Sequence, residues 1–183
     1  MNAAEQAAYF GGHAPRCLDP FRTIGTERPA IRLDGHGEPL NSFFLLGCSH
    51  CGGSAFSARG RVFLDDSSNP PKELFDNPVS LICSGCGRSD QLFDSMNDGY
   101  DPEACDFHYD KGVRKECEFL CPCGNGADFS RLLVRFEYPG DLFEMTEVES
   151  GKLRAENLFS WFTLVANCPG CGQVVQIEDC ECA

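Results

Sequence analysis

Four short cysteine pairs constrain the fold of this chain more than any other feature. In each pair the cysteines are separated by one or two residues, and a glycine follows the second cysteine directly. The four are Cys48/Cys51 with Gly52, Cys83/Cys86 with Gly87, Cys121/Cys123 with Gly124, and Cys168/Cys171 with Gly172. Glycine takes positive φ at no steric cost, so the chain can fold back there and point backbone N–H groups at the sulfur atoms. Two cysteines in such a turn present both thiolates to one metal ion.

The rest of the composition favours metal binding over disulfides. The chain has 183 residues and 13 cysteines, an odd number. Its first residues lack the basic start and the apolar stretch of a secretory signal, so we expect a cytoplasmic protein. No apolar run approaches the roughly 18 residues of a membrane span. In a reducing compartment, clustered cysteines bind metal more often than they form disulfides.

An internal repeat indicates which cysteine pairs belong together. In each half a short apolar stretch leads into one pair, an alternating segment follows, and an apolar segment returns to the other pair. These segments are 44–47, 56–64 and 79–83 in the first half and 119–120, 129–138 and 162–167 in the second. We interpret the chain as a tandem duplication. Pairing within each half then predicts one metal site from Cys48, Cys51, Cys83 and Cys86, and another from Cys121, Cys123, Cys168 and Cys171.

These paired knuckles resemble two zinc ribbons in a row, over residues 43–94 and 117–182. The resemblance implies small antiparallel sheets with the knuckles at the tops of β-hairpins. Residues 52–82 and 124–167, which separate the knuckles, exceed the usual spacing of roughly 15–20 residues, so each ribbon must carry an insertion. The third pair has one intervening residue, and Cys117 lies close enough in sequence to displace Cys121.

The sequence therefore predicts a mainly β protein: two tandem zinc-ribbon-like small antiparallel sheets with an extended N-terminal arm and at most short helices. A helical turn is predicted at residues 72–75 and a short helix from Asp101, where Pro102 fits the first helical position. Residues 149–152 are the predicted hairpin turn of the second half. The expected divisions are an arm at 1–42, a first ribbon at 43–94, a linker at 95–116 and a second ribbon at 117–183.

The predicted chemistry is two structural Zn²⁺ ions. A zinc ion held by four cysteines has no position for water or substrate, so we expect a protein that is not an enzyme and has no evident small-molecule substrate. An alternative is a metalloenzyme or redox protein that uses Cys105, His108 and Cys117 as a further metal site or a Cys–His nucleophile. The thiols without an assigned role are Cys17, Cys105, Cys180 and Cys182.

The charge of the chain argues against the nucleic-acid role that zinc ribbons often have. The formal net charge is −13, and thiolate-bound zinc makes it more negative, whereas phosphate binding needs a basic stripe. The nearest basic candidates are isolated strand positions: Arg59, Arg61, Arg131 and Arg135. We therefore expect an acidic protein-interaction module, either an adaptor or an inhibitor or immunity-type protein for a basic protein partner. A nucleic-acid-binding or transcription- or translation-associated zinc-ribbon protein is the alternative.

Overall fold

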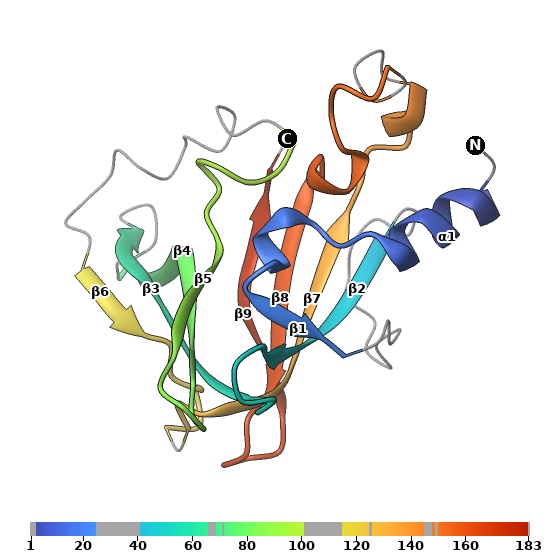
Figure 1. Cartoon of the computed structure of the whole chain (residues 1–183). Coiled ribbons are helices and arrows are strands. Elements are labelled where there is room, and N and C mark those ends of the chain that lie inside the picture. The colour runs from blue at the N-terminus through green and yellow to red at the C-terminus, as the bar shows by residue number, and fades with distance from the viewer. Residues whose placement is uncertain are drawn as a thin grey trace.

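The computed structural model describes residues 3–24, 41–65, 69–70, 72–100, 115–124, 126–144, 148 and 150–182. Within them the chain is mainly β, as predicted, with the short helix α1 (Ala3–Gly12) and a 9-stranded antiparallel sheet (Figure 1). In chain order the strands are β1 (Phe21–Thr23), β2 (Asn41–Cys48), β3 (Ala55–Asp65), β4 (Lys72–Cys83), β5 (Ser89–Phe93), β6 (Lys115–Glu118), β7 (Phe129–Glu137), β8 (Trp161–Asn167) and β9 (Val174–Glu181). Single 3-10 turns lie at η1 (Arg16–Leu18), η3 (Leu142–Glu144) and η4 (Ala155–Asn157).

The strands fall into two groups. One group, the β8 group, runs β1-β2-β7-β8-β9, and the other, the β4 group, runs β6-β3-β4-β5. They are joined where Ala55 and Phe56 of β3 pair with Ser130 and Phe129 of β7. Figure 1 shows the two groups diverging from this junction, and β4 lies against β9 across the space between them. The strands of both predicted ribbons thus belong to one curled sheet and do not form two small sheets.

The two halves of the chain exchange their first strands. In the first half, β3 pairs with β4 and β4 with β5, and in the second half β7 pairs with β8 and β8 with β9 in the same way. The first strand of each half, however, pairs with the other half: β2 lies against β7, and β6 lies against β3. The tandem duplication and its domain bounds stay predictions, but the pairings of β2 to β5 correspond to those of β6 to β9.

The core lies between the two groups and is largely aromatic. Phe93 of β5 stacks on Phe162 of β8, with ring centroids 4.0 Å apart. Phe136 of β7 approaches Phe162 edge-on at 5.6 Å. At the other end of the core, Phe10 of α1 stacks on Tyr138 at 3.8 Å, which docks the helix on the β8 group. All these side chains are buried, so each group covers the apolar face of the other.

Three local expectations can be compared with the structure. Residues 72–75 form the start of β4 and not a helical turn, because Leu74 and Phe75 pair across to β3 in an extended register. In the N-terminal arm, α1 spans 10 residues and residues 25–40 lie outside the described part of the chain, as does the expected helix from Asp101. At the predicted hairpin turn, Gly151 has φ 71° and donates its N–H to the carbonyl of Val148.

No helix among the described residues has the length and apolar character that crossing a membrane requires.

Candidate metal centres

The structure brings together the four cysteines predicted for the first site. The sulfur atoms of the first cluster, Cys48, Cys51, Cys83 and Cys86, all lie within 4.8 Å of one another. The Sγ atoms of Cys48 and Cys86 are 3.7 Å apart, and those of Cys51 and Cys83 are 3.5 Å apart. A tetrahedron of sulfur atoms about 2.3 Å from a central Zn²⁺ has edges of about 3.8 Å, so the cluster has the size that one such ion needs.

The second cluster has the same size. It consists of Cys121, Cys123, Cys168 and Cys171, again within 4.8 Å of one another. The Sγ atoms of Cys121 and Cys171 are 3.8 Å apart, as are those of Cys123 and Cys168. Cys117 is not a member: it lies on β6, opposite Gly60 of β3. Both clusters can hold a metal ion, and ligation by these particular cysteines stays a prediction.

The four knuckles fold by the same backbone hydrogen bonds. In three of them the N–H of the first cysteine donates to the carbonyl five residues on, at 2.7–2.9 Å, from Cys48 to Gly53, Cys83 to Arg88 and Cys168 to Gln173. The shorter third knuckle keeps this bond, from Cys121 to Gly126 at 3.1 Å. The glycines after the second cysteines have φ between 71° and 75° in all four. The missing residue in the third knuckle therefore leaves its closure intact.

Each cluster has a buried half and an exposed half. The first cysteine of every knuckle is buried and the second is exposed: Cys48, Cys83, Cys121 and Cys168 face inward, and Cys51, Cys86, Cys123 and Cys171 reach solvent. The buried cysteines are held by the sheet: Cys48 and Cys83 end strands, Cys168 directly follows one, and Cys121 lies three residues beyond the end of β6. The exposed cysteines stand on the turns, where a metal ion can reach them from solution.

Backbone groups prepare the buried sulfurs to bind a cation. The N–H of Cys51 lowers the pKa of Cys48 to about 7, and the N–H of Cys171 lowers the pKa of Cys168 to about 7. The N–H of Arg88 acts likewise on Cys86, but desolvation and the neighbouring thiols outweigh it and raise the pKa of Cys86 to about 12. Each cluster thus readily forms one thiolate, and a cation is needed to hold four together.

Each cluster joins the two strand groups. Cys48 ends β2 of the β8 group, whereas Cys83 ends β4 of the β4 group. In the second cluster Cys121 follows β6 of the β4 group, and Cys168 follows β8 of the β8 group. A metal ion in either cluster would therefore tie the two groups at the end where they meet.

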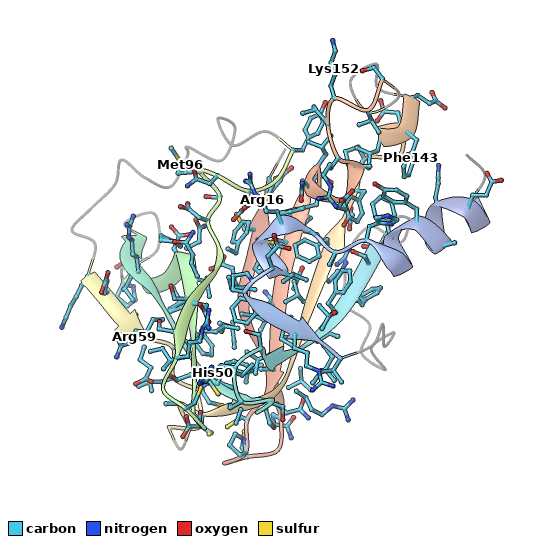
Figure 2. All side chains as sticks on the ribbon, viewed as in Figure 1. Arg16, His50, Arg59, Met96, Phe143 and Lys152 are labelled. Carbon is cyan, nitrogen blue, oxygen red and sulfur yellow. The ribbon has the colours of Figure 1, made fainter. Side chains whose placement is uncertain are left out.

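The surroundings of the two clusters differ in charge. Beside the first cluster, Arg88 donates its Nε–H to Asp90 at 2.7 Å. This bond, with a smaller contribution from Cys48 and Cys86, raises the pKa of Arg88. The guanidinium of Arg22 lies next to Gly52 of the same cluster. His50 is exposed in the first knuckle and is not one of the four ligands, and Figure 2 shows it beside the sulfur atoms. In the second cluster Gln173 takes the place of Arg88.

The remaining candidates from the sequence lie in different places. Arg59 and Arg61 on β3 stand opposite the acidic residues 118 and 116 of β6. Arg135 is buried, donates to the Asn41 side chain at 2.8 Å and pairs with the carboxylate of residue 137. Arg131 is exposed on β7 with φ 49°.

The cysteines without an assigned role lie apart from the clusters. Cys180 is half-buried and Cys182 is buried near the C-terminus, and Cys17 is half-buried in η1. Cys105 and His108 lie outside the described residues.

A buried acid on β9 was not found by sequence reasoning. Glu178 is 7% exposed, and its Oε2 atom has no hydrogen-bond partner among the described residues. Burial, and secondly the charge of Asp76, raise the pKa of Glu178 to about 8. The alternating sequence around Glu178 suggests an outward-facing acid, but the register between β8 and β9 shifts at Leu164/Val165, so both Ile177 and Glu178 are buried.

The eight thiols therefore form two groups of four, each drawn from the two knuckles of one half of the chain and each able to hold a metal ion. No other group of three or more metal-ligating side chains is gathered in the described part of the chain. No protein-family model matches the chain, and neither a curated protein nor a solved structure matches it.

Proposed function

We propose that this chain is a non-enzymatic zinc protein, in which two structural Zn²⁺ ions hold an acidic scaffold that binds a basic protein partner. The observation that carries the proposal is the size and placement of the two clusters. Their sulfur atoms are spaced as a tetrahedral thiolate site requires, and each cluster joins the two strand groups. A metal at this position acts on the fold as a whole.

The choice of zinc follows from the ligands. Four thiolates in a tetrahedral arrangement suit Zn²⁺, which has no geometric preference of its own and needs no redox partner. Four protein ligands also close the coordination sphere, so the ion has no position for a substrate. Structural zinc sites contribute apparent binding energies on the order of 10–16 kcal/mol, which is the range of an entire domain's stability. The ions thus serve the scaffold and not a reaction.

The basic partner follows from the charge. The net charge is −13, and a strongly negative surface attracts basic surfaces over long distances and speeds their association. An adaptor has this property, and so does an inhibitor or immunity-type protein that covers the active site of a nucleic-acid-degrading toxin. The nucleic-acid alternative finds little support in the described basic residues, since Arg135 is buried in an ion pair and Arg59 and Arg61 stand opposite acids.

Two measurements test the proposal together. Metal analysis of the purified chain should return zinc, with no absorbance band of a thiolate-bound iron. The zinc-loaded full chain, immobilised as bait in lysate of its native cell treated with nuclease, should retain a basic protein at low salt and release it as the ionic strength rises. Retention of RNA or DNA at physiological salt, in lysate without nuclease, would instead favour the nucleic-acid alternative.

A further inference from the structure

The strand correspondence of the two halves is broken at one place, the outer edge of the first knuckle strand. In the first half, β1 lies on this edge: Phe21 is opposite Cys48, Arg22 is opposite Gly47, and Thr23 is opposite Leu46. The N–H of Ile24 extends the pairing by donating to Leu45 at 2.7 Å. In the second half, β6 pairs with β3 alone among the described strands. Figure 1 shows β6 at the margin of the β4 group, away from β1.

The backbone of the second half presents the corresponding edge in the same way. Cys121 corresponds to Cys48, so Leu120 corresponds to Gly47. Phe119 directs its N–H inward, to the carbonyl of Ala58 on β3 at 2.8 Å. Because successive residues of a strand direct their backbone groups to opposite edges, the N–H and C=O of Leu120 point away from β3. These are the groups that pair with Arg22 in the first half.

Burial shows that this edge is incomplete. In the first half Leu46 and Cys48 are buried, and Gly47 is covered so closely that a Cβ there would lie 2.8 Å from Ile24. In the second half Phe119, the counterpart of Leu46, is only half-buried. Leu120 is 61% exposed, the largest value among the exposed large apolar side chains of the described residues. Within the described part of the chain neither backbone group of the exposed Leu120 has a hydrogen-bond partner, and such a strand edge is a template for a further strand.

The charges near this edge favour a basic occupant. Glu116 and Glu118 are exposed and share the face of the strand that Leu120 continues. Arg61 and Arg59 of β3 lie opposite them on one side, and the other side is the edge that an added strand would occupy. The first cluster has Arg22 beside it, contributed by β1, and Arg88 on the opposite knuckle. Gln173 replaces Arg88 at the second cluster, and no described strand supplies a counterpart of Arg22. A basic side chain on an added strand would fill that place beside four thiolates.

We propose that residues 118–121 form an open strand edge, to which the partner protein adds an extended antiparallel segment. The segment carries an apolar residue opposite Cys121 and an arginine or lysine opposite Leu120. In the first half Phe21 and Arg22 of β1 occupy these two places, opposite Cys48 and Gly47. The added backbone supplies hydrogen bonds to Leu120, and its apolar side chain completes the cover of Phe119. This assignment rests on the proposed basic partner and names the surface that the partner contacts.

The test uses the zinc-loaded full chain labelled with ¹⁵N and a synthetic peptide with the residue order Phe-Arg-Thr-Ile of residues 21–24, flanked by lysines. Titration should shift the amide resonances of residues 118–121 and slow hydrogen exchange at the Leu120 amide. A peptide with glutamate in place of the arginine should bind at least about tenfold more weakly, because it places a carboxylate beside Glu118 and the thiolates. Shifts centred on β9 or on the first knuckle would overturn the proposal.

Matched variants separate the edge from general effects of charge. Leu120→Pro removes the outward N–H without breaking a hydrogen bond of the described structure, and Leu120→Arg places a cation on the edge. Each should weaken peptide binding about tenfold or more while two zinc ions remain bound. Met96→Arg is the control, because Met96 is 44% exposed and lies far from the knuckles (Figure 2), and it should bind as wild type. Equal loss in all three variants would overturn the assignment.

The same variants show which of the two proposals fails, the open strand edge or the basic partner. A basic protein that is retained equally by wild type and Leu120→Pro would refute the edge and leave the basic partner standing. Retention of no basic protein, with peptide shifts still confined to residues 118–121, would refute the partner and support the edge. Concentration-dependent dimers that Leu120→Pro abolishes, or an oligonucleotide that shifts the same amides in place of the peptide, would each overturn the occupant assigned here.

Discussion

Phe56 lies directly opposite Phe129 at the point where β3 pairs with β7, and both side chains are buried. Phe56 is the second residue of β3 and Phe129 is the first residue of β7, and each of these long strands follows the first knuckle of its half. The rings of Phe129 and Phe119 also pack together, with centroids 5.6 Å apart, as do those of Phe56 and Phe21, with centroids 6.3 Å apart. The pair is therefore the joint between two halves that have exchanged their first strands, and it stands between the two clusters.

Loss of either aromatic ring at this joint should weaken the whole molecule. Phe56→Ala or Phe129→Ala leaves a cavity in a closed core, with a cost of about 3–5 kcal/mol in the free energy of unfolding. Chemical denaturation of the zinc-loaded variants, with metal release followed in the same sample, should show one transition that frees both ions. Val174→Ala is the control, since Val174 is exposed, and it should change stability by less than about 0.5 kcal/mol. Release of a single ion by either variant would contradict the expectation.

Metal content is the most direct prediction about the clusters. Native mass spectrometry should show a mass increase of two Zn²⁺ ions over the denatured chain, since the described residues contain two four-cysteine groups. Removal of both ions by a strong chelator should abolish cooperative unfolding, because each ion ties the β4 group to the β8 group. A single ion would contradict the second cluster, whereas a third would point to residues outside the described part of the chain.

Replacing one exposed ligand should reveal how strongly the clusters are coupled. Cys86→Ser removes a thiolate from the first cluster, and independent ribbons would then lose only the first half. Because β2 pairs with β7 and β6 with β3, we expect instead that the affinity of the second cluster for zinc also falls. Competition with a chromophoric chelator measures both affinities. Cys180→Ser is the control outside the clusters and should keep two ions. An unchanged second affinity would show that the exchange does not couple the sites.

The buried acid on β9 should make stability depend on pH. Glu178 has a pKa of about 8 in the folded chain, raised above its ordinary value by burial and by Asp76, so the native state favours the protonated carboxyl. Burial of Glu178 lowers the free energy of unfolding once this acid would be ionised in the unfolded chain. The loss of stability is absent below pH 4, grows as the pH rises, and is complete above pH 8. Glu178→Gln should raise stability at pH 8.5 by about 2–3 kcal/mol and flatten the profile between pH 5 and 8. Glu181→Gln, at an exposed site on the same strand, should leave the profile unchanged.

A hydrogen bond to a buried carboxylate adds to the docking of α1, beside the stacking of Phe10 on Tyr138. The hydroxyl of Tyr9 donates to Oε2 of Glu156 at 2.6 Å, and Arg154 pairs with the other oxygen at 2.5 Å. Tyr9→Phe removes the donor and should cost about 1–2 kcal/mol, because the carboxylate stays buried. Tyr100→Phe, at an exposed tyrosine, is the matched control. Faster proteolysis within α1 should accompany the loss in Tyr9→Phe, and equal stability of the two variants would contradict this role for Tyr9.

Local features of this fold were predictable because local chemistry determines them. The glycine after each cysteine pair and the alternation in residues 56–64 and 129–138 led to knuckles and strands that the structure contains. The pairing of cysteines within each half also agrees with the observed clusters. The side chains of residues 72–75 alone predict a helical turn, and their pairing with β3 overrides that weak preference.

The exchange of β2 and β6 could not be read from the sequence in the same way. Nothing within residues 41–48 or 115–118 specifies which of the two long strands they join. The choice depends on how the halves pack around Phe56 and Phe129, which is a property of the assembled core. The burial of Glu178 was hidden for a similar reason, because a register shift between two strands turned it inward.

The strand exchange also sets the order in which a newly made chain can complete its fold. While the ribosome has synthesised only the first half, β2 has no β7 to pair with, and Phe43 and Phe44 lack the residues of β7 that they lie opposite. Contacts between residues far apart in the chain form late and leave apolar segments open to chaperones or to aggregation. The cysteines of the first cluster leave the ribosome well before this pairing exists. Synthesis past residue 137, where β7 ends, is thus the event that closes the first half.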